Sequence, residues 1–131
     1  MLKLVSPAPS VALVAHKSYA PNPFVQLNSI ALVFLEAEFE RYLASHLLAK
    51  WPSIKILRRC TFEQLSARKE AQPQLVICGI EPKLAPILPT IWLSEIERSA
   101  SLVQLYPKLW KTTTPITGRD LLRAIELVLS Q

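Results

Sequence analysis

The chain has 131 residues, half of them apolar, and carries 15 Lys and Arg against 10 Asp and Glu, a formal charge of +5. This length is enough for one domain with a proper core and excludes two. The basic residues are scattered along the chain, which favours a solvated surface over a nucleic-acid-binding stripe.

Four prolines interrupt the first 28 residues. Each proline removes an amide donor and biases its predecessor toward extended backbone, so we expect no long helix there. Residues 11–15 predict one short strand, either at a sheet edge or pinned to the surface. We interpret residues 1–28 as an N-terminal linker or edge segment, and residues 29–131 as the domain.

A buried strand and an amphipathic helix are predicted next. Residues 30–35 form a continuous apolar run, which is typical of a strand covered on both faces. In the helix that follows, Phe39, Leu43 and Leu47 fall on one packing stripe, and Glu40 is predicted on the opposite, polar side.

Strands and helices then alternate. Residues 53–57 predict a second strand, Thr61 and Gln64 form a capping box that opens a short helix, and residues 75–80 predict a third, fully apolar strand. Parallel neighbouring strands need a crossover connection, so this alternation favours a parallel sheet with helices on both faces.

The prolines at positions 82, 86 and 89 leave no room for a third helix longer than one turn. Residues 90–93 predict the fourth strand and residues 94–102 a short helix. Residues 103–110 predict the fifth strand, which Pro107 either breaks or confines to an edge.

The last helix begins after Thr117, with Asp120 reinforcing the cap, and is expected to run to the C-terminus. The predicted fold class is therefore α/β: a flavodoxin-like, five-stranded parallel sheet with helices on both faces. Cys60 and Cys78 lack metal-ligand spacing and are expected to be buried, reduced thiols rather than a disulfide.

No apolar run approaches the roughly 18 residues that span a bilayer. The longest runs cover residues 11–15, 30–35 and 75–80. We therefore expect a cytoplasmic protein with no membrane contact.

Four segments resemble the receiver domain of bacterial response regulators. Residues 30–39 resemble its first strand and helix start, residues 73–80 its third strand, and residues 88–94 its fourth strand. Thr114 and Pro115, followed by Leu121 and Leu122, resemble its Lys-Pro motif and last helix. The interval of 44 residues from Leu35 to Gly79 matches the family's usual separation, whereas the 15 residues from Gly79 to Ser94 are about half of it.

The resemblance also identifies a degenerate phosphorylation pocket. Phe34 and Leu35 stand where the family has an acidic pair for Mg²⁺, Gly79 replaces the phosphoryl-accepting aspartate, and Thr114 replaces the lysine. Ser94 keeps the hydroxyl position. Phosphoryl transfer needs a carboxylate, a divalent cation and a balancing charge, so we expect no catalysis, no metal and no cofactor.

Contacts with other proteins are then the expected function. The resemblance implies an interface on the fourth helix, fifth strand and last helix, with candidate residues Ile96, Leu105, Tyr106, Trp110 and Leu122. Alternatively, Tyr106 and Trp110 cover the core where the third helix is short. The expected partner of this pseudo-receiver is a signalling kinase, a regulator or a second copy. The domain would be part of a hybrid sensor kinase or transcription regulator, or would act with one as a separate chain.

Two alternatives belong to other classes. One is a small flavodoxin-like ligand-binding domain or enzyme with its site at the carboxyl ends of the strands, although two glycines, Gly79 and Gly118, supply no phosphate-binding loop. The other is an adaptor that binds nucleic acid through its net positive charge. We expect a nucleic-acid partner less than a protein partner. Small-molecule thermal shifts would favour the first, and salt-dependent retention on DNA the second.

Overall fold

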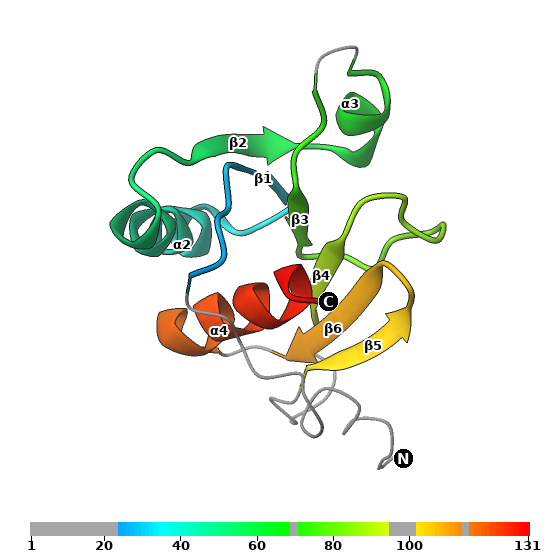
Figure 1. Cartoon of the computed structure of the whole chain (residues 1–131). Helices are drawn as coiled ribbons and strands as arrows, with labels where there is room; N and C mark the ends of the chain where they lie inside the picture. Colours follow the sequence, from blue (N-terminus) through cyan, green and yellow to red (C-terminus); the bar gives the residue numbers. More distant parts are fainter. Residues whose placement is uncertain (1–23, 69–70, 95–101, 114–115) are drawn as a thin grey trace.

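Six strands form a single sheet in the computed structural model, which describes residues 24–68, 71–94, 102–113 and 116–131 (Figure 1). In chain order the elements are β1 (Ser29–Val33), α2 (Ala37–Lys50), β2 (Lys55–Cys60), α3 (Phe62–Ser66), β3 (Leu75–Cys78), β4 (Thr90–Ser94), β5 (Val103–Tyr106), β6 (Leu109–Thr113) and α4 (Gly118–Leu129). The strand order is β2-β1-β3-β4-β6-β5, and all neighbours are parallel except β5 and β6.

The predicted α/β class is confirmed, but the sheet has six strands where five were expected. The predicted fifth strand over residues 103–110 is divided at Pro107 into a hairpin, whose second arm, β6, pairs parallel with β4. Proline has no amide to donate to a ladder, and the Pro107 carbonyl accepts a hydrogen bond from Gln104 Nε2 at 3.1 Å. β5 is therefore an antiparallel edge strand.

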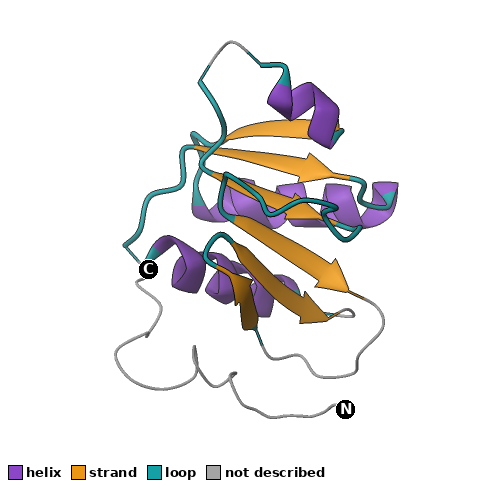
Figure 2. Cartoon of the chain, turned by 90° about the vertical axis from the view of Figure 1, so that its right-hand side faces the viewer, coloured by secondary structure: helices purple, strands orange, loops and turns teal. Residues whose placement is uncertain are grey.

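One face of the sheet, here called the helix face, is covered by α2 and α4 (Figure 2). Side chains alternate between the faces of a strand, so Ile30 and Leu32 of β1 point to the helix face. They pack there with core side chains of the other strands and of both helices: Leu43, Leu47, Leu75, Ile77, Ile91, Leu93, Trp110, Leu121 and Ile125. Where α2 meets α4, the Tyr42 hydroxyl accepts a hydrogen bond from the Gly118 amide at 3.0 Å.

The opposite face, here called the loop face, carries α3 and the connection between β3 and β4 (Figure 2). Its core holds Ala31, Val33, Leu65, Val76, Cys78, Trp92 and Leu109. Residues 79–89 contain no helix, which confirms the prediction made from their prolines. Helices therefore lie on both faces, as expected, but the loop face has only the short α3 among the described residues.

The helix caps confirm two further predictions. Thr61 and Gln64 form the reciprocal capping box of α3, and Thr117 Oγ1 accepts the Asp120 amide at 3.1 Å to begin α4. α4 ends at Leu129, so the expectation that it reaches the C-terminus was wrong by two residues. The helix predicted over residues 94–102 lies almost wholly outside the described residues, as does the strand predicted over residues 11–15.

No described helix is both long enough and apolar enough to cross a bilayer.

Candidate functional site

The carboxyl ends of the five parallel strands define the first candidate site. The strand order reverses between β1 and β3, and in open α/β sheets ligands bind outside the carboxyl ends at such a point. Phe34 follows β1 and Gly79 follows β3, so these two predicted pocket residues flank the reversal. Ser94 ends β4 at the same edge.

Phe34 and Gly79 are packed directly against each other. The Gly79 amide donates a hydrogen bond to the Val33 carbonyl at 3.0 Å. A Cβ atom added to Gly79 would lie far inside van der Waals contact with the Phe34 carbonyl oxygen. An aspartate at position 79 therefore does not fit unless the backbone of one strand end moves.

Phe34 itself holds an unusual backbone conformation. Its φ of 53° lies in the left-handed region, which costs an L-residue about 1–2 kcal/mol. The residue is 49% exposed, and its ring lies 6.5 Å from the Phe62 ring, centroid to centroid. An apolar, half-exposed residue thus occupies the carboxyl end of β1.

The remaining pocket residues contribute little reactive chemistry. Leu35 is half-buried and packs against the core of the helix face. Ser94 is buried and lies opposite Thr113 in the β4–β6 ladder. Thr114 falls outside the described residues. Within the described ranges, no three His, Cys, Asp or Glu side chains gather closely enough to hold a metal ion.

Glu40 lies at the same edge of the sheet, and its predicted exposure was wrong. It was expected on the polar side of its helix, but it is 2% exposed. Its carboxylate accepts hydrogen bonds from Arg58 Nε at 3.1 Å and from the Arg59 amide at 3.0 Å. The spacing of three residues to Leu43 places Glu40 on the buried stripe and was the available signal.

The Glu40 carboxylate holds an irregular strand end. The β1–β2 register shifts between Ala31 and Val33, which marks a bulge in β2. Arg59 lies in that bulge with a left-handed φ of 56°. Two left-handed residues, Phe34 and Arg59, therefore lie on the neighbouring ends of β1 and β2.

The two cysteines are separate free thiols on the strands that flank β1. Cys60 and Cys78 lie on either side of Val33, each paired with it from a neighbouring strand. Strands are spaced by about 4.8 Å, so the two Cα atoms are about 10 Å apart, beyond the reach of a disulfide. Both thiols are free, although Cys60 is only half-buried. Burial raises the pKa of Cys78 to about 12 and also raises that of Cys60.

The four predicted interface residues that the structure describes differ in burial. Trp110 is 3% exposed and belongs to the core of the helix face, so its assignment as a contact residue was wrong and its role is to fill the core. Leu122 is partly buried on α4 against the same core. Leu105 and Tyr106 are exposed on the edge strand β5. Ile96 lies outside the described residues.

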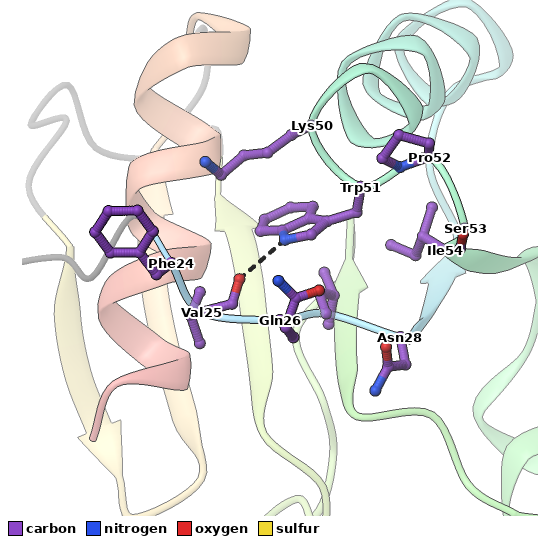
Figure 3. Close-up of a pocket in the computed structure, with 10 residues that line it drawn as sticks. Phe24, Val25, Gln26, Asn28, Lys50, Trp51, Pro52, Ser53 and Ile54 are labelled. Carbon is purple, nitrogen blue, oxygen red and sulfur yellow. Dashed lines mark hydrogen bonds between the residues drawn. The ribbon is translucent and has the colours of Figure 1, made fainter.

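A cleft of about 320 Å³ lies at the amino edge of the sheet, lined by residues 24–28 and 50–54 (Figure 3). Trp51 Nε1 donates to the Val25 carbonyl at 3.0 Å. Lys50 Nζ lies 2.8 Å from Glu126 Oε2 and 5.4 Å from the Trp51 ring centroid. The polar groups at this cleft are therefore already bound to one another. They connect the segment before β1 to the end of α2, and the end of α2 to α4.

No protein-family model, curated protein or solved structure matches this chain.

Proposed function

We propose that this chain is a receiver-like docking module of bacterial two-component signalling that binds proteins and does not accept a phosphoryl group. The order of its five parallel strands, β2-β1-β3-β4-β6, is the flavodoxin-like order with the ligand edge at the reversal between β1 and β3. The segments that resemble a receiver domain include β1, β3 and β4 of this order.

The observation that carries the proposal is the contact between Gly79 and Phe34. Phosphoryl transfer to a receiver needs a carboxylate at the end of the third parallel strand. Here that position is glycine, and the Phe34 carbonyl fills the space that a side chain would need. The side chains of Phe34 and Leu35 provide no oxygen ligand for Mg²⁺. The reactive centre is replaced by packed backbone and apolar side chains.

The phosphoryl-acceptor chemistry is tested by treating the purified chain with acetyl phosphate, or with beryllofluoride and Mg²⁺. Intact mass and amide NMR spectra are expected to stay unchanged, while an active receiver treated in parallel responds to both. The variant Gly79→Asp supplies the missing carboxylate and is also expected to remain unmodified, because the Phe34 carbonyl obstructs it. A stoichiometric response of the native chain would overturn the proposal.

A second copy, a signalling kinase and a regulator are the partners we propose for such a module. Sedimentation over a range of concentrations distinguishes self-association from binding to another protein. In either case the contacts are expected to use apolar side chains that the monomer leaves exposed.

A further inference from the structure

The connection between β3 and β4 exposes two large aliphatic side chains. Leu84 is 84% exposed and Ile87 is 88% exposed, whereas their neighbour Leu88 packs into the core of the loop face. The end of this connection is fixed, because the Val76 amide donates to the Pro89 carbonyl at 2.9 Å and Thr90 Oγ1 donates to the Leu88 carbonyl at 2.8 Å. Ile87 is thus presented to solvent from an anchored backbone.

The turn between β5 and β6 lies beside this connection. The Thr90 amide donates to the Lys108 carbonyl at 2.9 Å. Tyr106 is opposite Leu109 in the β5–β6 ladder, and opposed residues point to the same face. Leu109 belongs to the core of the loop face, so Tyr106, 55% exposed, points to that face as well. We call Leu84, Ile87 and Tyr106 the loop–hairpin surface; Figure 2 shows the connection in front of the sheet, above the hairpin.

The two segments that carry this surface have an excess of positive charge. Lys83 adjoins Leu84, and Lys108 lies in the hairpin turn; both are exposed. The described residues of the connection and the hairpin, 79–89 and 102–113, include three lysines and a single acidic residue, Glu81. A binding partner must therefore match apolar groups with negative charge around them.

We propose that the loop–hairpin surface binds an acidic, apolar segment of another protein, in which Leu, Ile, Phe or Trp side chains stand among Asp and Glu. This inference rests on the proposed docking function and names its surface and partner class. A second copy is disfavoured because it would bring Lys83 and Lys108 against their own counterparts. An anionic membrane is disfavoured because the surface has fewer than the about four to eight basic residues that mark such binding.

The test uses the full chain as bait for a phage-displayed library of random dodecapeptides. Enriched peptides are expected to combine acidic with large apolar residues. Their affinity, measured by fluorescence anisotropy, is expected to fall by about thirtyfold in the double variant Leu84→Ser/Ile87→Ser, the size of a hot-spot loss. Lys83→Glu should weaken binding and reduce its dependence on salt. The matched control is Leu48→Ser, which removes a side chain 46% exposed on α2, at the helix face.

Several outcomes would overturn the inference. They are a library without enrichment, enriched peptides without acidic residues, and equal binding by the double variant. Binding to phosphatidylserine vesicles, or dimerisation, that the double variant abolishes would assign the surface to a membrane or a second copy instead. Peptides that respond to Leu105→Ser or Leu122→Ser, and not to the loop variants, would move the contact elsewhere and leave the docking function standing. Since Leu84 and Ile87 are exposed, the double variant is expected to keep the native tryptophan fluorescence, which checks its fold.

Discussion

Replacing Glu40 by alanine tests whether a buried carboxylate holds the end of β2. The side chain is 2% exposed and accepts hydrogen bonds from Arg58 Nε and the Arg59 amide. Loss of a hydrogen bond to a charged group costs about 1.5–3 kcal/mol. The Arg58 side chain is 43% exposed, so water replaces most of its interaction and that part contributes less than about 1 kcal/mol. The Glu40→Ala variant should therefore be about 1.5–4 kcal/mol less stable.

Urea unfolding followed by tryptophan fluorescence measures this loss. Glu40→Gln keeps an oxygen that accepts the Arg59 amide and should lose less stability than Glu40→Ala. Glu38→Ala, an exposed glutamate in the same helical turn, should stay within about 0.5 kcal/mol of the native chain. Hydrogen exchange adds a local readout, because the Arg59 amide should lose its protection first. The reasoning is refuted if Glu40→Ala is no less stable than Glu38→Ala.

Three further predictions concern strand ends and a buried thiol. Gly79→Ala should lower stability by about 1–3 kcal/mol through overpacking against the Phe34 carbonyl; an unchanged melting temperature would contradict that contact. The Arg59→Gly variant should be more stable than Arg59→Ala by about 1 kcal/mol, since glycine adopts the left-handed φ without strain. Both variants keep the backbone amide that Glu40 binds. Equal urea midpoints of the two variants would show that the bulge does not persist in solution. The pKa of Cys78 is raised from 9.0 to about 12, so above pH 9 the thiol ionises in the unfolded chain while it stays protonated in the folded one. The free energy of unfolding is therefore unaffected by this thiol below pH 9 and decreases as the pH rises toward 12. The decrease is about 2 kcal/mol between pH 8 and pH 10.5. The Cys78→Ala variant should not show this decrease. If the stability of the native chain and of the variant changed with pH in the same way, the prediction would be refuted.

Local signals in the sequence were sufficient for several elements. Continuous apolar runs predicted β1 and β3 because a strand buried on both faces cannot alternate with polar residues. The Thr61 and Thr117 caps located the starts of α3 and α4, since each side chain binds a backbone amide only three residues away. The prolines at positions 82, 86 and 89 excluded a helix longer than one turn before β4 for a reason equally local, the missing amide.

The side of an element on which a residue is buried was harder to predict. For Trp110 the sequence left an interface contact and a core position both open, because it does not reveal that α4 packs over β6. Glu40 was placed on the polar side although its spacing from Leu43 indicated burial, and its partner Arg58 is 18 residues away. The antiparallel pairing of β5 was missed for a similar reason. Pro107 indicated that the predicted fifth strand is interrupted. Whether the chain then continues in the same direction or forms a hairpin depends on the neighbouring strand.

The candidate site divides in the same way. That residues 34, 35 and 79 carry no carboxylate follows from the sequence alone. That Gly79 lies against the Phe34 carbonyl, and that the connection carrying Leu84 and Ile87 lies on the same face of the sheet as Leu109 (Figure 2), was decided only by tertiary structure. Side-chain chemistry is fixed residue by residue, whereas contacts between distant segments depend on how strand register and crossover connections bring them together.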